Sequence, residues 1–384
     1  MDYAPTPSGR SRKPLLGGAV GARAIMDGRE VIVLGSNNYL GLASHPEVIA
    51  RAKEALDRYG AGPALNPPLA TTPVHEALCA ALAKFHRTES ALLFNSCTSA
   101  NVAVACTLVG AGDRIFSDRL NHASIIDGCR LSAAESRVYN HGDFAHLEAQ
   151  LAAPGGAPGA GRKLVITDGV FSMEGDAADL RPLIDICRRH DAALVVDESH
   201  AAGVIGPGGR GTAALRGCEG EIDLFTGTLS KAFGAFAGGY VAGPAGRIRE
   251  LHDRGRFFMF TTAVSPSAAA GALAAVEIAL RDPSLAERLA ENTRRLRGGL
   301  AKLGFRLLGG DSPITPVMIG DEAKAAAFSD ALMEAGVYVG SVRFPVVPRG
   351  EARLRAQPSA AHGAADIDEA LAAFERVGRR LALI

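Results

Sequence analysis

Short apolar runs alternate with amphipathic segments between residues 90 and 230. The runs that predict strands are 90–95 (SALLFN), 113–118 (DRIFSD), 163–169 (KLVITDG), 192–200 (AALVVDESH) and 223–229 (DLFTGTL). The segments that predict helices between them are 99–110 (SANVAVACTLVG), 122–131 (HASIIDGCRL) and 180–190 (LRPLIDICRRH). Strands that alternate with helices form a mostly parallel sheet with helices on both faces. We therefore predict an α/β fold for this part of the chain.

The flanking segments follow other patterns. Residues 29–42 (REVIVLGSNNYLGL) begin with a short strand, and 46–60 predict an amphipathic helix. Residues 60–73 (GAGPALNPPLATTP) are too rich in Gly and Pro for a regular helix or a central strand. The C-terminal part predicts a long helix over 285–304, strands at 313–320, 336–342 and 352–358, and a last helix over 366–380. We predict an N-terminal arm (1–45), a large domain (46–275) and a smaller α+β domain (276–384).

The composition narrows the class of protein. The chain has 384 residues, and 47% of them are hydrophobic, which is enough for a substantial core. Its 41 basic and 41 acidic residues balance, which argues against nucleic-acid binding. The six cysteines contain no CxxC pair, which argues against a zinc site or a disulfide framework. Neither a signal peptide nor a membrane-spanning run is recognisable. We expect a cytoplasmic protein with no metal, nucleic-acid or membrane partner.

Polar side chains stand where several predicted strands end. Asp197 and His200 follow one strand, and Thr228 and Lys231 follow the next. The carboxyl ends of parallel strands share one edge of the sheet, where α/β proteins bind their ligands. Residues 96–98 precede a predicted helix, and the free backbone N–H groups at a helix start favour a phosphate. We therefore expect an anion-binding site beside a lysine and a carboxylate.

These groups match what pyridoxal 5′-phosphate (PLP) requires of a protein. A lysine binds this cofactor as a Schiff base, and a carboxylate partners its pyridinium nitrogen. Asp197 would keep that nitrogen protonated, because an opposite charge favours the ionised form. Lys231 lies among small and apolar residues (227–241, GTLSKAFGAFAGGYV), which would be costly for a bare ammonium but suits a lysine bound to a cofactor. His122, at the start of a predicted helix, is a further candidate.

Six longer segments resemble the α-oxoamine synthases, which are PLP enzymes of the aspartate aminotransferase superfamily. They are 36–42 (SNNYLGL), 120–131 (LNHASIIDGCRL), 165–176 (VITDGVFSMEGD), 195–211 (VVDESHAAGVIGPGGRG), 227–241 and 352–362 (ARLRAQPSAAH). The resemblance implies PLP fold type I, with a mostly parallel seven-stranded sheet in the large domain. It also implies a Claisen-type condensation of glycine, alanine or serine with an acyl thioester of CoA or a carrier protein, followed by decarboxylation to an α-amino ketone.

The resemblance assigns roles around the cofactor ring. Lys231 is the Schiff-base lysine and moves the proton at the α-carbon of the amino acid. Asp197 pairs with the pyridine nitrogen, and His200 hydrogen-bonds the phenolic oxygen of the ring. His122 stacks on the ring and helps to position the acyl carbonyl. Ser172 lies near the ring oxygen and the Schiff base.

The resemblance also assigns the cofactor phosphate. The backbone of Cys97 and Thr98 and the hydroxyl of Thr228 would hold it within one subunit. Thr262 would reach the phosphate of a partner subunit, which implies a homodimer with shared active sites.

For the substrate carboxylate, the resemblance indicates Asn37 and Arg355, with Arg343 as a second candidate. Arginine suits this task because its guanidinium meets a carboxylate through two parallel hydrogen bonds. Arg355 also has a second interpretation, as a surface arginine on a strand.

Two positions depart from the family pattern. The Gly/Ser-rich loop of relatives is replaced by 60–75 (GAGPALNPPLATTPVH), which has three prolines before Thr71 and one more after Thr72. Thr98 stands where relatives commonly have an aromatic residue. Both places belong to the region that contacts the acyl substrate and the phosphate in relatives, so we expect an atypical acyl pocket.

The sequence leaves one other class of protein open and argues against two more. Another fold-type-I PLP enzyme, an aminotransferase or a lyase, would share Asp197 and Lys231. A PLP-binding regulator would need a DNA-binding segment before the PLP domain, and the few dozen residues there carry no sign of one. A purely structural protein would not need so many polar groups at strand ends.

Overall fold

The computed structural model describes residues 13–154 and 161–384, which divide into two compact units. The sheet unit comprises His45–Phe171 and Ala177–Pro283. The terminal unit comprises the chain up to Ser44, the short insert Ser172–Asp176, and Ser284–Ile384. Ser172 therefore belongs to the terminal unit, although it directly follows Phe171 of the sheet unit.

The sheet unit is built on seven strands in the order β3-β9-β8-β7-β6-β4-β5. They are β3 (Ser90–Phe94), β4 (Arg114–Asp118), β5 (Glu135–Tyr139), β6 (Lys163–Asp168), β7 (Ala192–Asp197), β8 (Leu224–Thr228) and β9 (Gly239–Gly243). Neighbours from β8 to β5 pair in parallel, and only β9 runs antiparallel to both of its neighbours. The predicted mostly parallel, seven-stranded sheet is confirmed.

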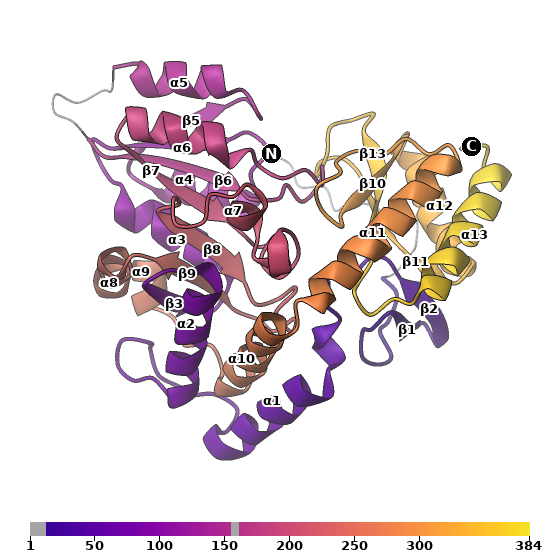
Figure 1. Cartoon of the computed structure of the whole chain (residues 1–384), viewed down its shortest axis with the longest axis horizontal. Helices are drawn as coiled ribbons and strands as arrows, with labels where there is room; N and C mark the ends of the chain where they lie inside the picture. Colours follow the sequence, from indigo (N-terminus) through magenta and orange to yellow (C-terminus); the bar gives the residue numbers. More distant parts are fainter. Residues whose placement is uncertain (1–12, 155–160) are drawn as a thin grey trace. The chain divides into compact units, whose positions relative to one another are not determined.

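Helices cover both faces of this sheet, as Figure 1 shows. One apolar core joins the strands to α3 (Cys97–Leu108), α4 (Ala123–Leu131), α8 (Ala245–Arg254) and α9 (Arg256–Met259). On the opposite face His86 of α2 (Pro73–His86) stacks on Phe225 of β8 with ring centroids 4.9 Å apart. The remaining helices of this unit are α1 (Pro46–Tyr59), α5 (Phe144–Ala152), α6 (Leu180–Arg189), α7 (Thr212–Leu215), α10 (Pro266–Arg281) and the 3₁₀ turn η2 (Pro207–Gly209).

The terminal unit joins the two ends of the chain. A three-stranded sheet pairs β1 (Arg23–Met26) and β2 (Arg29–Val33) with β11 (Val337–Tyr338), and a second sheet has the order β10-β13-β12. Its other elements are η1 (Leu42–Ser44), α11 (Ser284–Lys302), β10 (Thr315–Gly320), α12 (Glu322–Glu334), β12 (Gly340–Val342), β13 (Ala352–Ala356) and α13 (Ala364–Arg380). Phe305, Phe328 and Phe374 pack against one another in its core.

No helix within the described residues is long and apolar enough to span a bilayer. The six cysteines are all unbridged.

Candidate active site

The parallel strands of the sheet unit end in polar residues along one edge. Asp168 ends β6, Asp197 ends β7 and Thr228 ends β8. Asp168 and Asp197 are register partners, and Asp197 is paired with Thr226 on its other side. The carboxyl end of such a sheet is where ligands bind. The edge that the sequence indicated therefore carries the expected side chains.

Asp197 is buried and held by hydrogen-bond donors. Asp197 is 3% exposed. Asn101 Nδ2 donates to Asp197 Oδ2 at 2.7 Å, and the Ser199 backbone N–H donates to Oδ1 at 2.9 Å. The Cys97 thiol lies 3.6 Å from Oδ2. Hydrogen-bond donors of this kind stabilise a carboxylate.

The charge of Asp197 also acts on its neighbours. Burial and then the negative charge of Asp197 raise the pKa of the Cys97 thiol well above its usual value. Cys97 is therefore kept as a neutral thiol, with Ser199 Oγ donating to its sulfur at 3.2 Å. A neutral thiol is a poor nucleophile.

Asp168 is a second buried carboxyl group that the sequence analysis did not single out. It accepts the backbone N–H of His122 at 2.8 Å, which fixes the start of α4. Burial, followed by the negative charge of Asp197, raises the pKa of Asp168 well above its usual range. Its position at the end of an apolar strand, as for Asp197, was the signal in the sequence that could have found it.

Lys231 lies in the turn that follows β8. Its positive charge lowers the pKa values of Cys97 and Asp168, against the larger effect of burial, and lowers the pKa of His122 in the same direction as burial. Electrostatic effects of this kind weaken with distance, so the lysine lies in the same neighbourhood. The structure thus brings Lys231 and His122 together with the surroundings of Asp197.

The start of α3 offers donors to an anion. Ser96 caps the helix by accepting the Ser99 backbone N–H at 3.1 Å. Within the described chain nothing accepts the backbone N–H groups of Cys97 and Thr98, as is usual in the first turn of a helix. A Cβ on Gly239 would lie 2.3 Å from Cys97 N, so only glycine lets β9 approach this helix start. These groups fit the phosphate of PLP.

Thr228, the last residue of β8, and Ser230 bring two hydroxyl groups together. Thr228 Oγ1 lies 2.7 Å from Ser230 Oγ and accepts the Ser230 backbone N–H at 3.1 Å. The two hydroxyls form a pair suited to a phosphate oxygen. Ser230 was not among the residues that we predicted, although it stands between Thr228 and Lys231 in the same segment.

The two predicted histidines differ in their surroundings. His122 is the N-cap of α4, and its Nδ1 accepts the Ser124 backbone N–H at 3.3 Å. Desolvation lowers the pKa of His122, although the residue as a whole is exposed in the single chain. His200 is 8% exposed and lies in the turn that follows β7.

The predicted substrate residues belong to the terminal unit. Arg355 Nε donates to the Ser172 backbone oxygen at 2.5 Å, and Nη1 donates to Asn37 Oδ1 at 3.2 Å. Arg355 Nη2 is buried and has no hydrogen-bond partner in the described chain. A buried guanidinium nitrogen without a partner is costly unless a ligand oxygen meets it. Arg355 therefore fits a carboxylate. Arg343, the second predicted candidate, lies just after β12.

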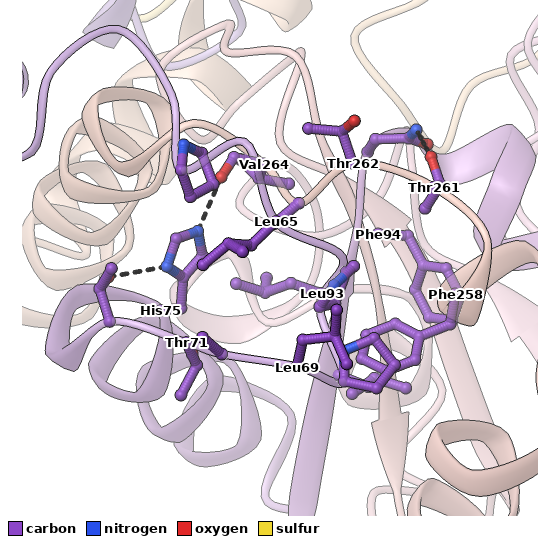
Figure 2. Close-up of a pocket in the computed structure, with 18 of the residues that line it drawn as sticks. Leu65, Leu69, Thr71, His75, Leu93, Phe94, Phe258, Thr261, Thr262 and Val264 are labelled. Carbon is purple, nitrogen blue, oxygen red and sulfur yellow. Dashed lines mark hydrogen bonds between the residues drawn. The ribbon is translucent and has the colours of Figure 1, made fainter.

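Thr262 lies on the wall of a cavity of about 390 Å³ (Figure 2). Leu65, Leu69 and Leu93 give this cavity apolar walls. His75 fixes one side, with Nε2 2.8 Å from the Val264 oxygen and Nδ1 2.8 Å from Thr72 Oγ1. The cavity is bounded by the Pro-rich segment 60–72 and by residues 261–264, and Asn95, just before the start of α3, also lines it. Thr262 is thus placed on this cavity and not in the hydrogen-bond network of Asp197.

These features together define a PLP enzyme of fold type I. They are the mostly parallel sheet, the buried aspartate at a strand end, the lysine after the next strand and the helix start with free N–H groups. Residues 29–374 match the family Aminotransferase class I and II. The chain belongs to this family and, within it, to the α-oxoamine synthases, which are PLP-dependent acyltransferases.

Relatives support this grouping. The chain is 47% identical over 363 residues to the 8-amino-7-oxononanoate synthase of Symbiobacterium thermophilum, covering 94% of this chain and 92% of that protein. It is 48% identical over 369 residues to the enzyme of the same name from Anaeromyxobacter dehalogenans strain 2CP-1, covering 96% and 91%. Among solved structures, the serine palmitoyltransferase of Sphingomonas wittichii superposes with a TM-score of 0.92 at 34% identity, covering 97% of this chain and 93% of that chain.

Proposed function

We propose that this enzyme condenses alanine with a seven-carbon dicarboxylic acyl thioester and releases CO2 and the free thiol. The single observation that carries the chemistry is the buried Asp197 carboxylate, which Asn101 and Ser199 hold by hydrogen bonds at the end of β7. The choice of substrates rests on the relatives, at 41–49% identity, that are named 8-amino-7-oxononanoate synthase.

The product name of those relatives specifies the two substrates. A nine-carbon acid with a ketone at carbon 7 and an amine at carbon 8 divides between these two carbons. Carbons 8 and 9 with the nitrogen are alanine without its carboxylate, and carbons 1 to 7 are a dicarboxylic acyl group. A bond forms between the alanine α-carbon and the thioester carbonyl, and the C–S bond breaks. The α-carbon gives up one proton, and the departing sulfur takes up one proton and leaves as the free thiol. The α-carbon then loses CO2 and takes up a proton.

The residues of the chain divide this work. When bound, PLP supplies an electron-accepting ring that stabilises negative charge at the α-carbon. Asp197 holds a proton at the pyridine nitrogen, and Lys231 moves the proton at the α-carbon. The N–H groups of Cys97 and Thr98 would hold the phosphate. Asp197 and the start of α3 are already oriented by the protein, so these groups need little reorganisation.

Other residues orient the reactants. Thr228 would add a hydroxyl donor to the phosphate, and His200 would hold the phenolic oxygen of the ring. His122 would stack on the ring and position the acyl carbonyl. Ser172 would lie near the ring oxygen.

Carboxylate recognition falls to the terminal unit. Arg355 offers Nη2 to a substrate carboxylate, and Asn37 supports the guanidinium through Nη1. Arg343 is the second candidate for the same task. Arginine is favoured over lysine here because a planar fork fixes the orientation of the carboxylate.

A reconstitution assay tests the proposed substrates. Purified enzyme with PLP is mixed with alanine, glycine or serine and with pimeloyl-CoA or a pimeloyl carrier-protein thioester, and products are identified by mass spectrometry while thiol release is followed. We expect 8-amino-7-oxononanoate from alanine with one of the two thioesters. A transaminated keto acid without thiol release would show an aminotransferase instead. Thiol release without any amino acid would show a thioesterase-like reaction and contradict the proposal.

We also propose that the enzyme works in the cytoplasm as a homodimer, with Thr262 reaching the phosphate of the partner subunit. Mixed dimers of Lys231→Ala and Thr262→Val test the shared site. If Thr262 serves the partner, one of the two sites in the mixed dimer has both native residues, so activity rises above that of either parent. No gain in a sample shown to contain mixed dimers would contradict sharing.

A further inference from the structure

A directed chain of hydrogen bonds connects Asp197 to His122 through the side chains of Asn101, which also holds Asp197, and Ser124. Asn101 Nδ2 lies 2.7 Å from Asp197 Oδ2 and 2.9 Å from Ser124 Oγ. Ser124 Oγ lies 2.8 Å from His122 Nδ1. Asn101 is 0% exposed and Ser124 is 4% exposed, so the two bonds that Asn101 donates are buried away from water.

The direction of each bond follows from the chemistry of its atoms. An ionised carboxylate only accepts, so the amide of Asn101 must turn its nitrogen toward Asp197. The second N–H of the same nitrogen then points at Ser124 Oγ. Ser124 accepts this bond and has one proton left, which it donates to His122 Nδ1.

A second donor fixes the histidine at the same atom. The Ser124 backbone N–H points at His122 Nδ1 from 3.3 Å, which is the capping bond of α4. Nδ1 must therefore offer a lone pair, and a neutral imidazole then has its proton on Nε2. The neutral form is favoured because desolvation lowers the pKa of His122.

We propose that Asn101 and Ser124 are positioning residues that hold His122 as the Nε2–H tautomer, with its donor directed away from α4. The inference rests on the proposed function, in which His122 positions the acyl carbonyl. The same carboxylate that holds the pyridine proton then also sets, through Asn101 and Ser124, which nitrogen of His122 can donate to a substrate oxygen. Neither residue touches the substrate in this account.

Histidine-selective ¹⁵N NMR tests the tautomer directly, in enzyme with and without PLP. The His122 signal is assigned from its loss in His122→Gln. We expect wild type and Ser124→Thr to show the Nε2–H tautomer at neutral pH. Ser124→Ala should show a mixture of the two tautomers, because Nδ1 loses its hydroxyl donor. Asn101→Leu should also show a mixture, because Ser124 Oγ no longer accepts the Asn101 N–H and is free to accept from His122 Nδ1 instead.

Kinetics give a second readout. In Ser124→Ala and Asn101→Leu we expect kcat to fall about 5- to 10-fold, with KM for the amino acid changed less than about 2-fold, as for the loss of one oriented donor. The pH profile of kcat should shift with the His122 titration. The double variant should lose little more than Asn101→Leu alone, because Asn101 and Ser124 act on His122 through one chain, whereas only Asn101 also holds Asp197.

A matched control separates positioning from folding. Asn292 is also a buried asparagine, and its Nδ2 donates to the Ser359 and His362 backbone oxygens at 2.9 Å each. Asn292→Leu should lower the unfolding free energy but leave the His122 signal and the pH profile unchanged. If Asn101→Leu does not fold, Ser124→Ala with Ser124→Thr carries the test alone.

Failure here and failure of the proposed function look different. If Ser124→Ala keeps the wild-type tautomer and pH profile, the inference is overturned while wild-type turnover stands. If wild type makes no ketone product but its His122 tautomer depends on Ser124, the function fails and the hydrogen-bond chain stands.

Discussion

Asp168 and Asp197 are register partners at the ends of β6 and β7, yet their carboxyl groups have different surroundings. Asp197 accepts from Asn101 and from the Ser199 backbone, which stabilise its charge. Asp168 accepts from the His122 backbone, and its pKa is raised because it is buried beside the charge of Asp197. Like charges on neighbouring strand ends repel, so the negative charge of Asp197 adds to the effect of burial on the pKa of Asp168.

The same substitution at the two aspartates should lower kcat by very different amounts. Asp197→Asn should lower kcat roughly 10²-fold or more, because the pyridine nitrogen loses its ionised partner. Asp168→Asn should cost less than about 10-fold, because an amide oxygen still accepts the His122 N–H. Steady-state kinetics on PLP-loaded variants measure both. Equal losses, with cofactor bound in both variants, would refute the assignment of the charge to Asp197.

Arg355 predicts a binding defect. Arg355→Lys should raise KM for the amino acid about 10- to 100-fold, because lysine cannot replace a planar fork at the substrate carboxylate. Arg353 is the matched control on the same strand. It is 1% exposed and is held by Glu351 and by the Met173 backbone oxygen, so Arg353→Lys should lower stability and leave KM unchanged. An unchanged KM in Arg355→Lys would remove Arg355 from substrate binding.

Gly239 predicts an effect on the cofactor phosphate. A Cβ there would overlap Cys97 N, so Gly239→Ala must displace β9 from the start of α3. We expect PLP to bind about 10-fold more weakly, which corresponds to the strain of a modest overpacking. Absorbance titration with PLP measures this. Gly246→Ala in α8, where a Cβ meets nothing within 4 Å, should leave PLP affinity intact. Equal affinities in all three proteins would contradict a phosphate site at α3.

Glu198 predicts a pH-dependent stability. Burial raises the pKa of Glu198 from 4.5 to about 8, and both carboxyl oxygens accept the Thr212 backbone N–H, at 3.1 and 3.0 Å. The folded-state pKa is the higher one, so the stabilisation is fully present below pH 4.5 and is lost as pH rises toward 8. The slope is at most about 1.4 kcal/mol per pH unit for one group.

Glu198→Gln should remove that slope. Urea unfolding between pH 5 and 8 should therefore show the variant gaining on wild type as pH rises. Glu375→Gln, on an exposed part of α13, is the control and should leave the slope in place. Parallel curves for Glu198→Gln and wild type would show that Glu198 does not titrate in this range.

The sequence predicted the parts of the fold that depend on strong periodicity. The runs that became β3, β4, β6, β7 and β8 are apolar because the sheet is covered on both faces. β5 and α5 were not predicted, because β5 is an edge strand whose residues Glu135–Tyr139 are mostly exposed and lack an apolar run. The reversed direction of β9 has no counterpart in its residues, since direction is set by pairing and not by composition.

The site was predicted as far as strand ends could indicate it. Asp197, Lys231 and His122 stand at junctions, where chain position alone suggests exposure to a ligand. Asn101 was missed because it lies inside α3 among small residues, and only the fold turns its amide toward Asp197. Chemistry that depends on which helix face meets which strand is not visible along the chain.

The tethering of the cofactor is the most direct test of the account. Enzyme loaded with PLP is reduced with borohydride and digested, and the modified peptide is sequenced by mass spectrometry. We expect the phosphopyridoxyl group on Lys231 and no label in Lys231→Ala. Lys163, whose Nζ donates to the His190 backbone oxygen, should stay unmodified in both. A label on any other lysine, or no label on protein supplied with PLP, would contradict the assignment of Lys231.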